Sequence, residues 1–404
     1  MAVGSDTFPA TMHPVAGFRL GVASAGIKKP GRRDVVLMEI APGSTVAGVF
    51  TLNAFCAAPV QVCKRHLQTH ISRYLLTNTG NANAGTGAQG LDDAQRCISA
   101  VAQLCDVAAE EVLPFSTGVI GEPLPVDKIL AVLGDAKADL KEDNWTLAAE
   151  GILTTDTRLK GSSVQLEING QTVTLTGISK GSGMIQPNMA TMLGYVATDA
   201  KIAQPALQTL LSSATQRSFN RITVDSDTST NDSCILAATG ASGVEISSEA
   251  DLAQFSAALD QLMIELAHAI IRDGEGATKF VAIEVEKAAA QQEALDVAFT
   301  VAHSPLVKTA LFASDANWGR ILAAVGRAGV DQLDIDALQI YLDDVCIVEN
   351  GGRALSYTEE AGAAVMAQQD IRIRIVLNRG DVNEIVWTTD LSHDYVTINA
   401  DYRS

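Results

Sequence analysis

Short apolar runs separated by turn residues dominate the first part of the chain. Val35–Ile40 and Thr45–Phe50 are two such runs, and a Pro-Gly pair lies between them. Apolar runs of about four to eight residues bounded by glycine and proline are typical of strands. We therefore expect residues 15–66 to form antiparallel strands, followed by a short strand at Tyr74–Thr77.

Helical spacing of apolar residues begins after about residue 92. Apolar residues recur at steps of three and four from Ala94 to Cys105, which places them on one face of a helix. A capping-box pattern at 248–251 predicts the start of a longer helix that ends at Arg272, just before a glycine. The same spacing predicts helices at Val126–Leu133, Trp145–Leu153 and Gln204–Arg217, and near 293–302, 320–329 and 358–368.

A β-hairpin is predicted at Asn169-Gly170, because this dipeptide is the strongest short-range turn signal in the chain. Ser163–Ile168 and Gln171–Gly177 flank it. A further apolar run, Thr191–Val196, predicts a buried strand. Strands are also predicted at 222–225, 280–286, 338–348, 371–377 and 384–389. Strands and helices in this arrangement predict an α/β protein with mixed sheets layered with helices.

Composition excludes several classes of function. The 404 residues suffice for about two or three domains. A formal net charge of −18 disfavours a nucleic-acid surface, since such surfaces are basic. The first residues show no basic segment followed by an apolar run, and no apolar stretch approaches membrane-spanning length. We therefore expect a cytoplasmic protein with no nucleic-acid and no membrane partner.

The six cysteines indicate reduced thiols. No Cys-x-x-Cys pair occurs, and Cys97 and Cys105 fall on the apolar face of a predicted helix, as structural thiols do. We expect neither disulfides nor a metal site.

A G-x-G-x-x-G pattern occurs at Gly85, Gly87 and Gly90. In dinucleotide-binding loops the glycines directly follow a strand. Here the asparagine-rich run Asn78–Ala84 comes between, so we reject a dinucleotide site. A structural or functional loop rich in polar backbone is the better interpretation.

The stretch from Lys180 to Thr191 places a hydroxyl at the start of a strand, after a flexible, glycine-containing loop. Attack of the Thr191 hydroxyl on the Ala190 carbonyl would release a chain that begins with Thr191. Its new α-amine, with an ordinary pKa of about 7.7–8.0, would then serve as the base for the same hydroxyl. A threonine that merely opens a strand is the simpler alternative, because β-branched residues favour strands.

Residues 180–193, Lys-Gly-Ser-Gly-Met-Ile-Gln-Pro-Asn-Met-Ala-Thr-Met-Leu, resemble the signature of the ornithine acetyltransferase (glutamate N-acetyltransferase) family of arginine biosynthesis. The runs Asn78–Gly87 and Gly21–Lys28 are similar to this family as well, and the resemblance extends from Gly17 to Ser404. It implies cleavage between Ala190 and Thr191. Residues 1–190 would form an α chain and residues 191–404 a β chain, interlocked and assembled as α2β2.

The resemblance also implies the residues of the site. Thr191 matches the nucleophile and acetyl acceptor of the family. Thr117 and Gly118, in the run Ser-Thr-Gly-Val-Ile-Gly, match an oxyanion hole. The positions that match substrate-binding residues are Thr154, Lys180, Thr191, Glu275, Asn399 and Ser404.

Several of these positions have simpler interpretations. Residues 114–125, with three prolines and two glycines, read as a plain loop. Helix capping by Thr155 or Asp156 is an alternative explanation of the cluster that contains Thr154. Lys180 would, on sequence alone, be a solvated loop lysine.

Glycines flank Glu275 and are explained by a helix end, although this does not explain the acid between them. A carboxylate is the counterpart of an ornithine ammonium group. The apolar and aromatic tail 394–404 is predicted to dock on the protein. The hydroxyl- and acid-rich run 226–233 is either a cation or phosphate site or a turn with local side-chain bonds, and both alternatives stay open.

The resemblance therefore implies acetyl transfer from N-acetylornithine to glutamate through an acetyl-threonine intermediate. No cofactor is required, and use of acetyl-CoA as a second donor stays open. The rival interpretations are a self-cleaving N-terminal-threonine aminopeptidase or amidase, in which water removes the acyl group, and a non-catalytic amino-acid-binding protein, which would stay a single chain.

Overall fold

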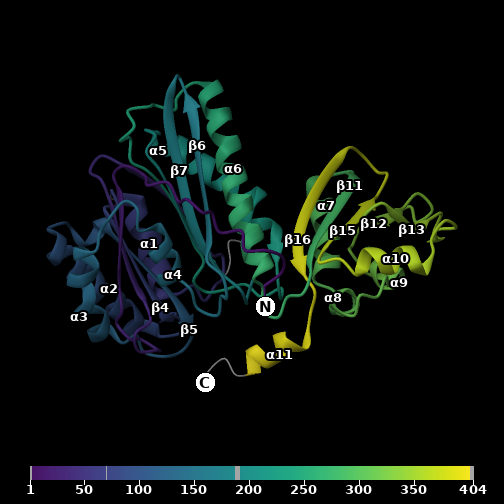
Figure 1. The fold of residues 1–404 in the computed structure, drawn as a ribbon, viewed down its shortest axis with the longest axis horizontal. Helices are drawn as coiled ribbons and strands as arrows, with labels where there is room; N and C mark the ends of the chain where they lie inside the picture. Colours follow the sequence, from purple (N-terminus) through teal and green to yellow (C-terminus); the bar gives the residue numbers. More distant parts are fainter. Residues whose placement is uncertain (1, 70, 187–191, 401–404) are drawn as a thin grey trace. The chain divides into compact units, whose positions relative to one another are not determined.

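The structure, a computed structural model, describes residues 2–69, 71–186 and 192–400 (Figure 1). It divides into two compact units. The larger unit comprises Asp6–Asn220 and Asp227–Ile270, and the smaller unit comprises Met1–Ser5, Arg221–Ser226 and Ile271–Ser404. The predicted boundary between the α and β chains is a point of backbone cleavage. The division into packed units does not test such a cleavage, so the boundary stays a prediction.

Two mixed sheets form the larger unit. The four-stranded sheet has the order β1 (Phe18–Ala23), β2 (Val35–Ile40), β4 (Tyr74–Asn81), β5 (Val112–Val119). The five-stranded sheet has the order β3 (Thr45–Phe50), β10 (Ser233–Ala238), β8 (Leu193–Thr198), β7 (Gln171–Lys180), β6 (Lys160–Ile168). The β4–β5 and β8–β10 pairs are parallel and the others antiparallel.

The two sheets share one hydrophobic core. Val36 and Met38 of β2 pack in this core with Leu193 and Tyr195 of β8. The alternate residues of β2, among them Leu37, face a second core, so that this strand is buried on both faces and reads as a continuous apolar run. The helices of this unit are α1 (Ala58–Thr69), α2 (Gly87–Cys105), α3 (Val126–Ala138), α4 (Trp145–Gly151), α5 (Gln204–Arg217) and α6 (Glu249–Arg272).

These helices cover the sheets on both sides. Residues of α2 and α3 fill the second core, against the outer face of the four-stranded sheet. Helix α6 runs along β6 and β7 (Figure 1), where a Cβ on Gly177 would touch Leu262 and Leu266. Two short 3₁₀ segments lie at Ala109–Glu111 and Phe219–Arg221.

A seven-stranded mixed sheet forms the smaller unit. Val281, Ile283 and Val285 lie on one of its inner strands, β11 (Phe280–Ala288), and face a core built with α7. The strand order is β14 (Gly352–Arg353), β13 (Val345–Glu349), β12 (Gln339–Leu342), β15 (Asp370–Val376), β11 (Phe280–Ala288), β16 (Val382–Thr389), β9 (Ile222–Thr223). The helices are α7 (Gln291–Ala302), α8 (Pro305–Phe312), α9 (Trp318–Gly326), α10 (Glu359–Met366) and α11 (His393–Ala400).

The α/β fold with mixed sheets and covering helices is confirmed. The predicted hairpin forms between β6 and β7, with Asn169 and Gly170 both at positive φ, as a tight hairpin turn requires. Strand β8 is buried throughout, as predicted for the stretch after residue 192.

The prediction of strands throughout 15–66 was wrong for residues 58–66, which belong to α1. Val60, Cys63 and Leu67 lie three and four residues apart and pack on the core shared by the two sheets. This helical period overrode the strand propensity of the valines.

The prediction of a plain loop at 114–125 was wrong for its first part, because β5 extends to Val119. This strand lies at the edge of its sheet. An edge strand tolerates proline, because the missing N–H faces away from the ladder. The strand predicted at 338–348 is in fact two, β12 and β13, joined by a tight turn with Asp343 at positive φ.

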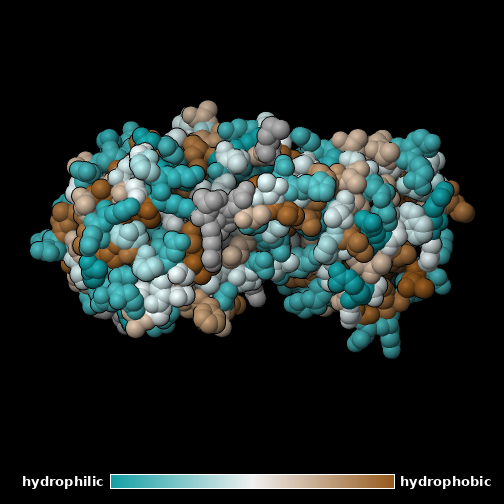
Figure 2. Space-filling model, turned by 90° about the horizontal axis from the view of Figure 1, so that it is seen from below, coloured by the Kyte–Doolittle hydropathy of each residue, from teal (hydrophilic) through white to brown (hydrophobic). Residues whose placement is uncertain are grey.

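All six cysteines are free thiols, as predicted. On the face of the molecule shown in Figure 2, hydrophobic residues lie in small groups among hydrophilic ones. Within the described ranges, no helix combines the length and the apolar character needed to cross a membrane.

Replacement of Gly21 by alanine should lower the thermal stability, because α3 packs directly on β1 at this position. A Cβ at Gly21 would overlap the carbonyl oxygen of Ala136 and lie 3.1 Å from the Leu140 nitrogen. Overpacking typically costs about 1–3 kcal/mol. Thermal unfolding followed by circular dichroism measures this loss.

Gly134→Ala is the matched control. Gly134 lies in α3, with no atom within 4 Å of a Cβ built on it, and alanine favours a helix over glycine by about 0.5–1 kcal/mol. Its melting temperature should equal or exceed that of the unmodified protein. Equal melting temperatures for Gly21→Ala and the unmodified protein would contradict the close packing of β1 and α3.

Candidate active site

Thr117 and Gly118 lie near the end of β5, where the chain needs glycine. Gly118 has a φ of 136°, and a Cβ there would overlap the Gly80 carbonyl carbon and lie 2.5 Å from the Asn81 nitrogen. The register of β4 against β5 shifts at Gly80 and Asn81. The strand ends in a bulge that is typical of functional sites, and this bulge fixes the position of Thr117.

Lys180 is the last residue of β7 and approaches Thr117 from the other sheet. Its ammonium group donates a hydrogen bond to the Thr117 hydroxyl over 3.2 Å. The Lys180 side chain is 5% exposed, so the interpretation as a solvated loop lysine was wrong. The structure thus brings together two residues that the resemblance assigned separately.

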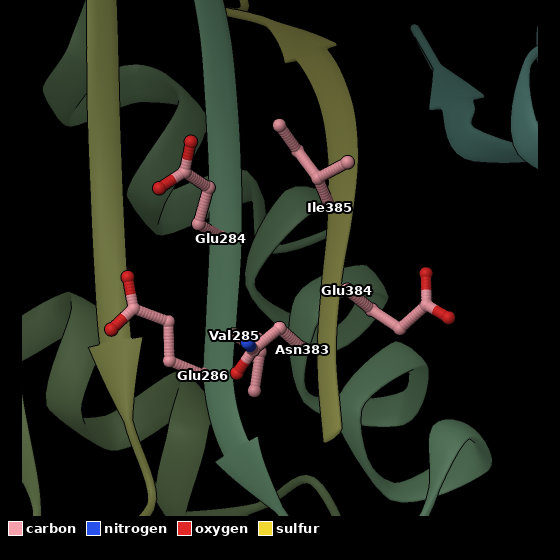
Figure 3. Close-up of a pocket in the computed structure, with 6 residues that line it drawn as sticks. All are labelled: Glu284, Val285, Glu286, Asn383, Glu384 and Ile385. Atoms are coloured by element: carbon pink, nitrogen blue, oxygen red, sulfur yellow. The ribbon is translucent and has the colours of Figure 1, made fainter. Parts of the chain in front are cut away.

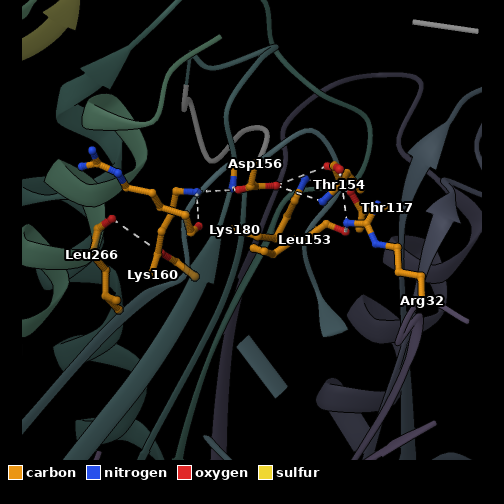
Figure 4. Close-up of polar contacts among 11 residues, drawn as sticks. Arg32, Thr117, Leu153, Thr154, Asp156, Lys160, Lys180 and Leu266 are labelled. Atoms are coloured by element: carbon orange, nitrogen blue, oxygen red, sulfur yellow. Dashed lines mark hydrogen bonds and ion pairs between the residues drawn. The ribbon is translucent and has the colours of Figure 1, made fainter. Parts of the chain in front are cut away.

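Asp156 lies beside this pair in a fully buried position (Figure 4). Its carboxylate accepts from the Lys160 ammonium at 2.7 Å, from the Gly181 N–H at 2.7 Å and from the Thr154 N–H at 2.9 Å. Burial alone would raise the pKa of this carboxyl. The positive charges of Lys160 and Lys180, together with the hydrogen bonds, instead hold that pKa below its ordinary range.

Thr154 is held by the same carboxylate. Its backbone N–H and its hydroxyl both point to Asp156, the hydroxyl at 3.5 Å, and its carbonyl accepts from Arg32 at 3.2 Å (Figure 4). The predicted local contact of Asp156 is therefore present, and it is made with Thr154, the residue that matches a substrate-binding position of the family. The sequence marked Asp156 only as a capping residue. Its pairing with Lys160, four residues later, was overlooked, and Lys180 approaches it from the end of β7.

Two asparagines hold the bulge in place, Asn78 of β4 and Asn231 of the run 226–233. Ser116 donates to the Asn78 side chain at 2.6 Å, and Asn231 donates to the Ala82 and Ser116 carbonyls at 2.6 and 2.8 Å. These amides satisfy buried backbone carbonyls that the irregular strand pair leaves unpaired. Asn78, in the asparagine-rich run, therefore has a structural role, and α2 begins at Gly87, five residues earlier than predicted.

Glu275 and Asn399 meet in the smaller unit. The Asn399 amide donates to the Glu275 carboxylate at 2.9 Å, and Glu275 is 7% exposed. Ser392 donates to the Gly276 carbonyl at 2.6 Å, and a Cβ on Gly276 would lie 2.5 Å from the Tyr395 nitrogen. The predicted docking of the tail is confirmed for α11, a helix that the sequence analysis did not predict.

Lys308 is a buried lysine that the sequence analysis missed. Its ammonium donates to the Thr388 hydroxyl at 3.0 Å and to the Thr389 carbonyl. Burial lowers its pKa to about 8, while the charges of Asp390 and Asp225 act in the opposite direction. It anchors α8 to the end of β16, directly before the segment that leads to α11.

Three predicted site residues, Ala190, Thr191 and Ser404, lie outside the described residues. Thr117, Gly118, Thr154 and Lys180 belong to the larger unit, and Glu275 and Asn399 belong to the smaller unit. The structure therefore describes the site as two separate groups.

A hollow of about 320 Å³ lies on the smaller unit's sheet, and none of the candidate residues lines it (Figure 3). Its carboxylates are matched by arginines: Glu286 pairs with Arg374 at 3.0 Å and Glu384 with Arg221 at 3.0 Å. It is therefore a salt-bridged sheet surface rather than a cation site.

The described residues contain no group of three or more His, Cys, Asp and Glu residues placed to hold a metal ion. The sequence analysis overlooked His66 and His70, whose spacing is that of paired metal ligands on a helix. The Nδ1 atom of His66 lies 3.0 Å from the Val112 carbonyl oxygen, and His70 lies outside the described residues.

Comparison with known proteins decides the family. The model of the ArgJ family matches residues 19–404. The chain belongs to the ArgJ family. The arginine biosynthesis bifunctional protein ArgJ of Pseudomonas fluorescens is 60% identical to this ArgJ-family chain over the full length of both. The assignment that we made from the signature at 180–193 is confirmed.

Solved structures include relatives of this ArgJ-family chain. The arginine biosynthesis bifunctional protein from Bacillus halodurans is 41% identical, with a TM-score of 0.50, and the match covers 52% of this chain and 99% of that chain. Ornithine acetyltransferase from Mycobacterium tuberculosis, solved in complex with ornithine, is 35% identical with a TM-score of 0.39, and covers 45% of this chain and 97% of that chain.

Asp156→Asn should destabilise this ArgJ-family protein by about 3–5 kcal/mol, the usual cost of breaking a buried ion pair. Because the pKa of Asp156 is depressed in the folded state, its contribution is complete above the unfolded pKa of about 3.9 and is lost as the pH falls below it. Thermal unfolding at pH 7 and at pH 3 measures both effects, and the difference between variant and unmodified protein should shrink at pH 3.

Asp127→Asn is the control, because the exposed Asp127 side chain pairs with Arg96 at 2.8 Å. Exposed pairs contribute at most about 1 kcal/mol. Equal losses for the two variants at pH 7 would contradict the buried ion pair at Asp156.

Proposed function

We propose that this protein is a glutamate N-acetyltransferase of arginine biosynthesis, which moves the acetyl group of N-acetylornithine to glutamate. Membership of the ArgJ family over residues 19–404 supports the activity. The observation that carries the chemistry is the contact between Lys180 and Thr117 at the end of β7, ten residues before the candidate cleavage bond.

In the first half-reaction Thr191 acts as nucleophile. Its α-amine takes the hydroxyl proton while Oγ bonds to the acetyl carbon, and the carbonyl electron pair moves onto oxygen. Collapse of this intermediate breaks the carbon–nitrogen bond, and the ornithine nitrogen leaves with the proton. Glutamate then attacks the threonine ester by the same steps in reverse order.

Thr117 and Gly118 stabilise the negative charge that develops on the acetyl oxygen. Preorganised donors of this kind are each worth about 2.7–4 kcal/mol in enzymes where one has been removed. The ammonium of Lys180 adds a positive charge at Thr117 in a buried position, where electrostatic interactions are stronger than in water.

Glu275 binds the side-chain ammonium group of ornithine. It is a buried carboxylate that the Asn399 amide orients through a 2.9 Å hydrogen bond. The ammonium of a diamino acid would make a charge-assisted hydrogen bond with this carboxylate. Thr154, Lys180 and Ser404 complete the proposed substrate contacts.

Cleavage between Ala190 and Thr191 creates the α-amine. The solved relative from Bacillus halodurans is matched over 99% of its length by only 52% of this chain, so that polypeptide is about half as long. Residues 191–404 are 214 of the 404 residues, or about 53%. This agreement in length supports the cleavage point. The two chains of each protomer stay interlocked, and two protomers form the α2β2 assembly.

Acetyl-CoA is the proposed second acetyl donor, which would yield N-acetylglutamate directly. The printed name of the Pseudomonas fluorescens relative describes a bifunctional protein, and this favours two activities for the present chain. The same acetyl-threonine would serve both donors, without a metal or another cofactor.

Purified protein mixed with N-acetylornithine should release ornithine continuously only when glutamate is present. Without glutamate, release should stop after about one ornithine per active site, because the acetyl group stays on the threonine. Chromatographic quantification of ornithine and N-acetylglutamate measures both quantities.

Thr191→Ala is the control variant and should be inactive with either donor. Continuous ornithine release without glutamate would instead identify a hydrolase of the amidase type. Transfer at the unmodified rate by Thr191→Ala would exclude Thr191 as the nucleophile.

A further inference from the structure

Helix α11 is docked on the smaller unit although none of its residues is buried. Its aliphatic side chains remain in contact with solvent, with Val396 64% and Ile398 37% exposed. An isolated helix of this length is marginal in water, and most helices in proteins are stabilised by packing of an apolar face. Such packing is missing along α11, so individual contacts of its side chains must hold it in place.

Contacts at the start of α11 hold it against the loop that contains Glu275. Ser392, directly before the helix, donates to the Gly276 carbonyl at 2.6 Å. Gly276 has a φ of 70°, and a Cβ there would lie 2.6 Å from the Ser392 hydroxyl oxygen. The ring of His393 meets the ring of Phe312 on α8 edge to face, with 5.6 Å between the ring centroids. The first turn of α11 therefore lies against both this loop and α8.

The Glu275 loop also packs against the segment that follows β9. A Cβ on Gly274 would lie 3.2 Å from a methyl carbon of Val224 and 3.0 Å from the methyl carbon of Thr389. Val224 is the residue directly before Asp225. The carboxylates of Glu275 and Asp225 therefore come from two segments of the smaller unit that are in close contact.

Two side chains of α11 reach these two carboxylates. Tyr395 and Asn399 are four residues apart, which places them on one face of the helix. The Asn399 amide donates to the Glu275 carboxylate at 2.9 Å, and the Tyr395 hydroxyl donates to the Asp225 carboxylate at 3.3 Å. The Asn399 amide also donates to the Tyr395 carbonyl at 3.0 Å. The position of Asn399 on Glu275 is therefore linked to that of Tyr395 on Asp225.

Asp225 differs from the run 226–233 that follows it. Within that run the Asn231 N–H donates to the Ser229 hydroxyl at 3.1 Å, a local bond of the kind expected in a turn. Asp225 accepts instead from Tyr395, 170 residues later in the chain. Its charge also acts on the buried Lys308, whose pKa it raises against the effect of burial. The Asp225 carboxylate thus links β9 to α11.

We propose that Tyr395 and Asp225 form a latch, which holds α11 on the Glu275 loop and thereby sets the affinity of the protein for a diamino acid. The proposal rests on the proposed function, in which Glu275 binds the side-chain ammonium group of ornithine. Tyr395 and Asp225 are positioning residues, because they act on the ligand through Asn399 and Glu275.

The latch controls affinity through the docking equilibrium of α11. With α11 docked, the Asn399 amide fixes the orientation of the Glu275 carboxylate. A ligand that binds only the docked state loses apparent affinity in proportion to the fraction of protein in that state. Because hydrogen bonds to ionised groups are stronger than those between neutral groups, loss of the Tyr395 hydroxyl should lower this fraction.

The first test measures binding of ornithine to the whole protein by titration calorimetry. Tyr395→Phe, which removes only the hydroxyl, should raise the Kd for ornithine at least about threefold. Tyr357→Phe is the matched control, because the Tyr357 hydroxyl donates to the Glu359 carboxylate at 3.1 Å in the same unit. The control should leave this Kd within about 1.5-fold, since neither residue belongs to the latch.

A double-variant cycle tests the pair. In an Asp225→Ala background the acceptor is gone, so Tyr395→Phe should change the Kd for ornithine by less than about 1.5-fold. Lys308 keeps the charge of Asp390 in this background. An equal fold-change in the presence and in the absence of Asp225 would show that the two residues act independently, and would overturn the latch.

Hydrogen exchange of residues 393–400 measures docking itself. Exchange should be faster in Tyr395→Phe and unchanged in Tyr357→Phe, because only the first variant loses a contact of α11. Unchanged exchange in Tyr395→Phe overturns the proposal, as does faster exchange with a smaller rise in Kd than predicted. Absence of ornithine binding by the unmodified protein also overturns it. Ornithine binding without acetyl transfer would instead refute the proposed function and leave the latch supported or overturned by these measurements.

Discussion

The site depends on buried positive charge where β6 begins and β7 ends. Lys160 and Lys180 are both buried there, and the charges of both lysines hold the pKa of Asp156 below its ordinary range. Burial raises the pKa of Asp232, another acid close to Lys180, well above its ordinary value. The ammonium of Lys180 contacts the Thr117 hydroxyl. An oxyanion would meet a preorganised positive field there.

The packing of two sheets creates this arrangement. Thr117 lies on an edge strand of the four-stranded sheet and Lys180 on an inner strand of the five-stranded sheet, and the shared core brings the two strand ends together. The parallel pair β8–β10 adds Asp232 at the start of β8. The bulge at Gly118 requires glycine, because a Cβ at this position would collide with the backbone of β4. Each polar group thus lies at a strand end, where the backbone ladder leaves room for chemistry.

Signals from neighbouring residues in the sequence predicted much of the fold. Contacts between residues far apart in the sequence could not be predicted from them. The Asn169-Gly170 hairpin and the periodic helices depend on neighbouring residues and were predicted correctly. The edge strand at Pro114 was not, because only the finished sheet shows which strands lie at an edge. The signature around Thr191 gave the family. The surroundings of Asp156 could be predicted only in part, because Lys160 is four residues away but Lys180 and Gly181 come from the far end of β7.

The central claim is that a threonine freed by self-cleavage carries the acetyl group. Intact-mass spectrometry of the purified protein, mixed with N-acetylornithine in the absence of glutamate, tests it directly. We predict two polypeptides, residues 1–190 and residues 191–404, with one acetyl group added to the second and located on Thr191. A single uncleaved chain, or release of ornithine without any acetylated polypeptide, would contradict the account.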